Sequence, residues 1–216
     1  MANPEHVAIL KRGVQFWNFW RGENPNTRPD FSGADLSQIS LRRAFLAGAN
    51  LEGASLVSAD VEKAIIWKAN LQKANLQSAN LEEADLLEAN LKSVNFLRAN
   101  MQKADLTKAN LKEAVLAMAD LGWVRLWQAN LREADLYKAN LEKANLYRAN
   151  LEGAELLATN FSRAILLEAK LKGALHLSVR QISQAMTLHK AELEEALMGR
   201  LQAYHPHLLE RPKTGE

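Results

Sequence analysis

Residues 71–90 read LQKAN-LQSAN-LEEAD-LLEAN, four successive pentapeptides that begin with Leu, carry Ala in fourth place and end in Asn or Asp. The same period runs from Phe31 to Leu175 without a slip of phase and gives 29 pentapeptides. Their first residue is Leu in 23 cases, the fourth is Ala in 25, and the fifth is Asn or Asp in 19. So strict an internal repeat determines the architecture before any single residue is considered.

A period of five fits neither common secondary structure. It sweeps around a helix of 3.6 residues per turn and leaves no fixed face, and it violates the two-residue period of a flat strand. A chain that turns a corner every five residues satisfies it, with Leu and Ala pointing inward. We expect the corners at Asn and Asp, because these side chains bond nearby backbone and tolerate unusual φ. Successive coils would pair backbone to backbone at the ~4.8 Å spacing of a sheet.

The pentapeptides Leu71 to Asn75 and Leu76 to Asn80 resemble the A(D/N)LXX signature of the pentapeptide-repeat family. The resemblance covers about two-thirds of the chain and implies an all-β solenoid, a right-handed quadrilateral β-helix. Four pentapeptides would form one coil, and the repeat region would make about seven coils. The number of sides follows from the resemblance and not from the period.

The segments outside the repeat are expected to form α-helical caps at both ends, because a solenoid must cover its terminal core and edges. Residues 1–30 would form a capping helix and a linker, with Asn3 as the N-cap and Gly22 near the helix end. Residues 31–175 would form the β-helix. Residues 176–216 would form a second helical cap and a tail, with one helix from Ser178 through Met186, another from about Ala191 to Tyr204, and a frayed end after Arg211.

Family members often dimerise through their carboxy-terminal end. The resemblance therefore implies that the carboxy-terminal helices either cap the rod or pair with a second copy as a homodimer.

The outward-facing second residues of the pentapeptides alternate in character. One set is polar, as in Glu82 and Lys92, and the other is largely apolar, as in Trp67 and Leu87. In a four-sided coil, this alternation places exposed apolar ladders on two opposite faces. The ladder that is richer in aromatic residues is the candidate interaction surface, since buried aromatic anchors dominate interface energetics. It comprises Phe45, Ile65, Trp67, Leu87, Trp127, Tyr147, Ile165 and Leu167.

Two alternatives to this interpretation of the apolar ladders stay open. Side chains one coil apart could simply pack on each other and shield the backbone, without binding anything. The opposite ladder, with Val57, Leu97, Tyr137 and Leu157, is the less aromatic of the two. A secondary candidate site is Trp123 with Arg125, in the segment that departs most from the consensus.

No constellation of residues predicts catalysis. The chain contains no Cys, which excludes disulfides and thiolate metal sites. Its five His residues show no catalytic or metal-binding spacing, and there is no Gly-rich phosphate loop or GxSxG motif. We therefore expect no enzyme activity, no cofactor and no metal.

The charge balance restricts the partners. The formal net charge is +2, and the repeat region holds 18 basic and 17 acidic residues. A near-neutral rod gives no reason to expect nucleic acid as a partner. The resemblance also implies an alternative, a DNA mimic that modulates DNA gyrase or another type II topoisomerase, but such a mimic should be strongly acidic. The chain lacks a membrane-length apolar run and a secretory signal pattern, so we expect a cytoplasmic protein. The sequence thus predicts a non-catalytic protein-interaction or scaffold module, whose partner is another protein or a second copy.

Overall fold

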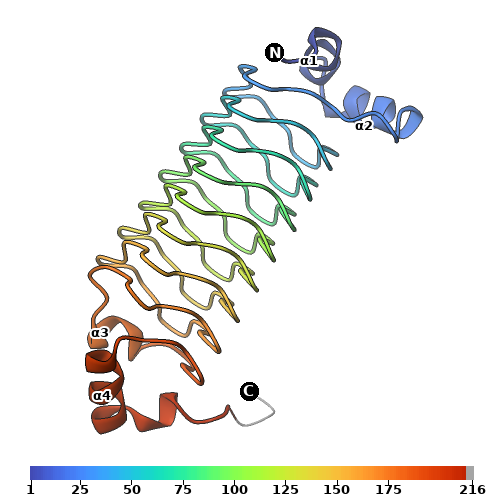
Figure 1. Cartoon of the computed structure of the whole chain (residues 1–216). Helices are drawn as coiled ribbons and strands as arrows, with labels where there is room; N and C mark the ends of the chain where they lie inside the picture. The colour runs from blue at the N-terminus through green and yellow to red at the C-terminus, as the bar shows by residue number, and fades with distance from the viewer. Residues whose placement is uncertain (213–216) are drawn as a thin grey trace.

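The computed structural model describes residues 1–212. They form an elongated stack of similar coils with helices at both ends (Figure 1). Helices α1 (Pro4–Lys11) and α2 (Val14–Glu23) lie at the amino-terminal end. Helices α3 (Val179–Ile182) and α4 (Glu195–Tyr204) and a 3-10 turn, Pro206–Leu208, lie at the carboxy-terminal end.

The register between coils is four pentapeptides. Parallel β-bridges join each fifth-position residue to the fifth-position residue four pentapeptides later, from Asp30 with Asn50 through to Glu155 with Leu175. Four pentapeptides therefore make one coil, as expected from the resemblance. Equivalent positions of successive coils consequently stack into rows that run along the rod.

The corner of each pentapeptide lies at its second and third residues. The third residue has a positive φ in every pentapeptide from Gly33 (67°) to Gly173 (72°), and the fourth N–H donates to the first C=O, as from Ala74 to Leu71 at 3.0 Å. A positive φ at only the second central residue is the mark of a type II turn. The expectation that Asn and Asp form the corners is therefore wrong: the fifth residue is extended and pairs with the next coil.

The fifth-position side chains instead hold the backbone of the next turn. Asn90 Oδ1 accepts the Lys92 N–H at 3.4 Å, and Asp105 Oδ1 accepts the Thr107 N–H at 2.9 Å. Asn side chains also bond to one another along the rod, with Asn90 Nδ2 donating to Asn70 Oδ1 at 2.9 Å. The expected bonding of these side chains to nearby backbone is confirmed, but it stabilises a turn that begins two residues later.

The first and fourth residues fill the interior. Leu71, Ala74, Leu91 and the larger Phe96 are at most 1% exposed, and their equivalents are similarly buried except at the two ends of the repeat, where Ala34, Ile39 and Ala174 are partly exposed. Alanine is favoured at the fourth place because the tight coil leaves little room there. The departures Val94, Val124 and Thr159 are modest in size, and the larger Ile39 lies in the first coil, where it is partly exposed.

The amino-terminal segment forms two helices and not the single one expected. Asn3 is the N-cap as predicted, since its Oδ1 accepts from the Glu5 N–H at 2.9 Å. Gly13, with a φ of 124°, separates α1 from α2. Trp17 of α2 is fully buried and packs edge-on against Phe31 of the first coil, with ring centroids 5.2 Å apart.

The carboxy-terminal helices are shorter than expected because the β-helix continues beyond residue 175. Helix α3 ends at Ile182 and not at Met186, although Ser178 is its N-cap as predicted. The segment 188–192 forms another pentapeptide turn that is two residues out of phase: Lys190 has a φ of 56°, and Glu192 pairs with Lys170. Helix α4 therefore begins at Glu195 and not near Ala191. The predicted frayed tail lies largely outside the described residues.

None of the helices in residues 1–212 is long and apolar enough to cross a membrane.

The left-handed third position yields a stability prediction. Ser78 is exposed and has a φ of 56°. We expect Ser78→Gly to stabilise the fold by about 0.5–1 kcal/mol, because glycine removes the cost of a Cβ in this region while adding some entropy to the unfolded chain. Ser78→Val should destabilise it. The neighbouring Gln77 has a negative φ, so Gln77→Gly is the control and should destabilise in urea unfolding; equal effects at the two positions would refute this assignment.

Candidate interaction surface

The eight predicted surface residues lie together on one side of the rod. The coil-to-coil register places Trp67, Leu87, Trp127, Tyr147 and Leu167 in one row of second-position residues. Phe45, Ile65 and Ile165 belong to the adjacent row of fifth-position residues, in which Phe45 bridges to Ile65. These two rows, which start at Phe45 and Ala47 and recur once in every coil, are called the aromatic face below.

The side chains of the aromatic face are partly packed and partly exposed. Trp127 and Tyr147, one coil apart, have ring centroids 5.6 Å apart, yet Trp127 remains 47% exposed. Ile65 is 36% exposed, and the other six of the eight predicted residues are half-buried. Packing along the row therefore accounts for part of this surface but leaves one of its two tryptophans, Trp127, nearly half exposed.

Polar residues interrupt the aromatic face at its middle. The fifth-position row continues from Ile65 through Asp85, Asp105, Arg125 and Asn145 to Ile165. Arg125 Nη2 pairs with Asp105 Oδ2 at 2.8 Å. Partial burial alone would raise the pKa of Asp105, but hydrogen bonds from Arg125 and from Thr107 outweigh it and hold that pKa below its ordinary value.

The secondary candidate does not form a unit of its own. Arg125 lies in the fifth-position row of the aromatic face, whereas Trp123 is the third residue of its pentapeptide and is 57% exposed. Lys143 Nζ lies 4.4 Å from the centroid of the Trp123 ring. The two residues are thus neighbours in sequence that serve different rows.

The opposite face repeats the pattern more weakly. Half a coil, or two pentapeptides, separates Trp67 from Gln77 and Trp127 from Tyr137. This face exposes Leu157 at 47% and Met118 at 40%, and it carries Tyr137 as its one second-position aromatic residue. It offers a matched comparison surface on the same rod.

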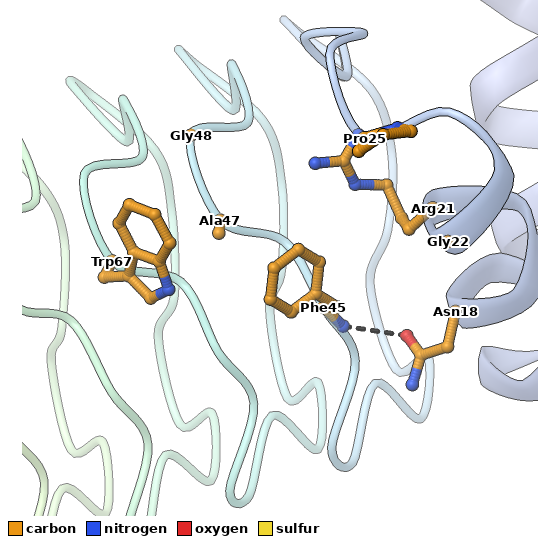
Figure 2. A pocket seen from close by; sticks show the side chains of 8 residues that line it. All are labelled: Asn18, Arg21, Gly22, Pro25, Phe45, Ala47, Gly48 and Trp67. Atoms are coloured by element: carbon orange, nitrogen blue, oxygen red, sulfur yellow. Dashed lines mark hydrogen bonds between the residues drawn. The ribbon is translucent and has the colours of Figure 1, made fainter.

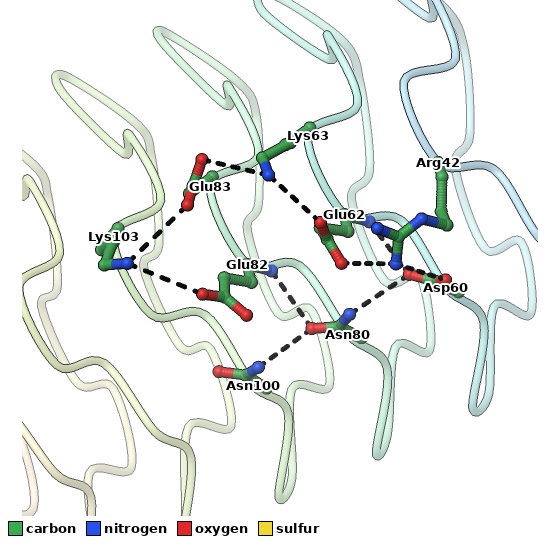
Figure 3. Close-up of polar contacts among 9 residues, drawn as sticks. All are labelled: Arg42, Asp60, Glu62, Lys63, Asn80, Glu82, Glu83, Asn100 and Lys103. Atoms are coloured by element: carbon green, nitrogen blue, oxygen red, sulfur yellow. Dashed lines mark hydrogen bonds and ion pairs between the residues drawn. The ribbon is translucent and has the colours of Figure 1, made fainter.

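The polar sides neutralise their own charges. Figure 3 shows one of them, where Lys63 pairs with Glu62 at 3.3 Å and with Glu83 at 3.5 Å. Lys103 on the next coil contacts Glu83 at 3.7 Å and Glu82 at 3.8 Å. Such exposed pairs contribute little to stability individually. They leave few uncompensated charges for an ionic partner on this side.

The aromatic face ends in a pocket beneath α2. This pocket has a volume of about 480 Å³ and lies between Arg21 and Pro25 on one side and Phe45, Ala47 and Trp67 on the other (Figure 2). Asn18 of α2 joins the two sides by accepting the Phe45 N–H at 2.8 Å. The side chain thereby replaces the carbonyl of a preceding coil, which the first coil lacks.

The α2 side of this pocket is not evident from the sequence, in which Asn18, Arg21 and Pro25 belong only to a predicted terminal helix and its end. One signal was present: Arg21 follows Trp17 by four residues and so lies on the buried side of the helix, where a basic residue is unusual. Arg21 is 6% exposed.

No group of three or more His, Cys, Asp or Glu residues in the described part of the chain is close enough together to hold a metal ion.

A chain whose five-residue turns pair in parallel with their equivalents one coil away is a parallel β-helix solenoid. The profile of the family described as pentapeptide repeats matches residues 30–67, 69–107, 94–128, 114–153 and 144–175. The chain belongs to this family, whose members fold as right-handed quadrilateral β-helices.

Several solved structures are similar to this chain. HetL, a pentapeptide repeat protein involved in heterocyst differentiation regulation from the cyanobacterium Nostoc sp. strain PCC 7120, is 32% identical, with 81% of this chain and 92% of HetL covered and a TM-score of 0.44. A trypsin-treated form of QnrB1, a plasmid-mediated fluoroquinolone resistance protein, is 18% identical, with 80% and 91% covered and a TM-score of 0.49. Rfr23 from the cyanobacterium Cyanothece 51142 is 22% identical, with 82% and 94% covered and a TM-score of 0.24. No curated protein matches the chain.

The ion pair within the aromatic face has a predicted pH dependence. Because the pKa of Asp105 is lowered in the folded state, its stabilising contribution is present above the unfolded pKa of about 3.9 and is lost as the pH falls through the folded value. Arg125→Ala should therefore lower the free energy of unfolding at pH 7 by at most about 1 kcal/mol, since Arg125 is well exposed. In denaturant titrations, this difference should shrink below about pH 4. A difference that is constant with pH, or one that persists in the Asp105→Asn background, would contradict the pairing.

Proposed function

We propose that this protein is a non-catalytic interaction module that binds a protein partner through the aromatic face. The proposal agrees with the general character of pentapeptide-repeat proteins as non-catalytic structural or interaction modules. The observation that carries it is the exposure of Trp127 and Ile65 in the two adjacent rows of the aromatic face. A row that served only to shield the backbone would gain nothing from a half-exposed indole.

The rows are also suited to binding by their geometry. Their pairing from coil to coil fixes side chains at sheet spacing on a rigid surface, which lowers the entropy lost on binding. Tryptophan and tyrosine supply large contact areas and are enriched among the residues that dominate interface energetics. Trp127, packed against Tyr147, is the expected centre of the interface.

The helical ends support a second part of the proposal, a closed rod of about seven coils. Trp17 Nε1 donates to the Phe45 carbonyl at 2.9 Å, and the Asp30 N–H donates to His6 Nδ1 at 3.1 Å, so that α1 and α2 satisfy the first coil. At the other end, the Leu188 N–H donates to the Leu208 carbonyl at 2.7 Å. These contacts favour caps that keep the coil edges from pairing with other chains.

The DNA-mimic alternative gains no support from the surface. Duplex DNA carries one negative charge per ~1.7 Å of its axis, whereas the acidic residues of this rod are matched by basic ones, as between Lys103 and Glu83. We therefore do not propose it.

The interaction proposal predicts a specific loss of binding. Replacing Trp67, Trp127 and Tyr147 by Ser should abolish capture of the partner from a native lysate while leaving the circular dichroism spectrum and cooperative melting nearly unchanged, because these side chains lie outside the coil interior. Mass spectrometry of proteins cross-linked at Trp127 would identify the partner.

The opposite face provides the matched control. The triple change of Leu97, Tyr137 and Leu157 to Ser removes similar side chains from equivalent second positions and should leave capture intact. If the aromatic-face variant still captures the same protein, or if it unfolds, the aromatic face is structural and the proposal fails.

The carboxy-terminal end is proposed to join two copies into a homodimer. It exposes Leu175 and Met186 at 52% each and Tyr204 at 75%. Sedimentation equilibrium should show a monomer–dimer equilibrium that Met186→Asp together with Tyr204→Asp shifts to monomer. Phe19→Asp, at a residue 73% exposed at the other end, is the control and should not change it. A wild-type chain that remains monomeric at all concentrations would refute the dimer.

A further inference from the structure

The pocket beneath α2 combines an apolar wall with a buried cation. Phe45, Ala47 and Trp67 form the wall, and the Arg21 side chain extends along the other side next to Pro25 (Figure 2). The Arg21 guanidinium carbon lies 5.6 Å from the centroid of the Phe45 ring. The pocket volume, about 480 Å³, lies within the ordinary range for ligand sites.

The bonding of Arg21 is incomplete. Its Nη1 donates to the carbonyls of Thr27 at 2.7 Å and Asn24 at 3.0 Å, which fixes the loop after α2. Its Nε is buried and has no hydrogen-bond partner. No carboxylate within residues 1–212 forms an ion pair with Arg21, and burial lowers the pKa of its guanidinium. Arginine nevertheless stays charged in proteins, so this cation is buried without an anion.

The guanidinium donors that have no acceptor determine which chemical group could bind to Arg21. With Nη1 used by the loop, Nη2 and the unpartnered Nε remain, and these two donors lie side by side in the geometry that binds a carboxylate through two parallel hydrogen bonds. Because Nε is buried, the Arg21 side chain must shift toward the pocket for both donors to reach one carboxylate. The neighbouring wall of Phe45, Ala47 and Trp67 requires an apolar group next to that carboxylate.

We propose that this pocket binds the carboxyl terminus of a partner polypeptide whose last residue is apolar, an inference that rests on the proposed function of the aromatic face. The terminal carboxylate would pair with Arg21 and the last side chain would lie on Trp67. The pocket opens onto the same row of second-position residues that continues to Leu87 and Trp127. An extended chain that ends in the pocket can therefore continue along the aromatic face, which a small acid cannot do.

The test compares peptides that differ only at their last group. A fluorescent heptapeptide that ends in Leu with a free carboxylate is titrated against the full chain, beside the same peptide as its carboxamide and beside N-acetyl-leucine. We expect the free carboxylate to bind about tenfold or more tightly than the amide, because hydrogen bonds between charged groups are among the strongest. N-acetyl-leucine should bind more weakly than the peptide.

Two variants locate the binding. Ala47→Leu should fill the pocket while leaving the bonds of Arg21 to the loop in place, and it should remove the preference for the carboxylate. Ala117→Leu is the matched control, since Ala47 and Ala117 are both second-position residues that are 7% exposed, and Ala117 lies on the opposite face; it should keep the preference. Arg21→Gln should also lose the preference, and its melting curve reports whether the loop is still held.

The outcomes separate this inference from the proposed function. Equal binding of the carboxylate and the amide, or binding unaffected by Ala47→Leu, overturns the pocket assignment, while partner capture through Trp127 can still stand. Binding of N-acetyl-leucine as tight as that of the peptide overturns the polypeptide terminus as the ligand. A carboxylate preference in the wild-type chain that is abolished by Ala47→Leu and kept by Ala117→Leu supports the inference.

Discussion

The parallel pairing of equivalent residues on neighbouring coils is the interaction on which the rest of the structure depends. Each bridge, such as Asn70 with Asn90, fixes the position of a whole pentapeptide relative to the one on the next coil. Once this register is set, residues at the same position of every fourth pentapeptide stack into a row along the rod. Leu and Ala rows become the core, Asn rows become hydrogen-bonded ladders, and second-position rows become faces. The pairing connects each coil only to the coils directly beside it, as is usual in solenoids.

The cost of this register falls on the third residue, which must adopt a left-handed φ in every pentapeptide. Residues such as Lys108 and Glu133 accept that conformation because the turn bond and the two flanking bridges over-determine it. The sequence carried a sign of this that the periodicity alone did not reveal, since five of its ten Gly residues, including Gly48 and Gly153, occupy third positions. Asn and Asp have the more indirect role of accepting the N–H that starts the next turn.

The regular part of the fold was therefore predictable, and the irregular parts were not. Strict phase from Phe31 to Leu175 was enough to assign the interior rows, and the four-sided coil implied by the family resemblance then grouped Trp67, Trp127 and Tyr147 on one face. The out-of-phase turn at 188–192 escaped because the two residues inserted around α3 break the frame, although Leu188, Ala191 and Leu193 keep the pattern. The break at Gly13 was missed because helical spacing of apolar residues continues across it. The pocket could not be predicted at all, because it depends on how α2 docks on the first coil.

That docking explains why the end of the rod differs chemically from its middle. Within the stack, each coil meets the equivalent backbone groups of the next coil, so its backbone hydrogen bonds are made by repetition. The first coil has no predecessor, so side chains of α2 must replace a missing backbone: Asn18 and Trp17 bond to the main chain of Phe45. A helix that meets a coil cannot match it at every atom, and the mismatch lies at Arg21, which holds the loop with one nitrogen and leaves another unpartnered. A repeat protein thus acquires a distinct polar group where its repetition stops, next to the apolar row that the repetition has built.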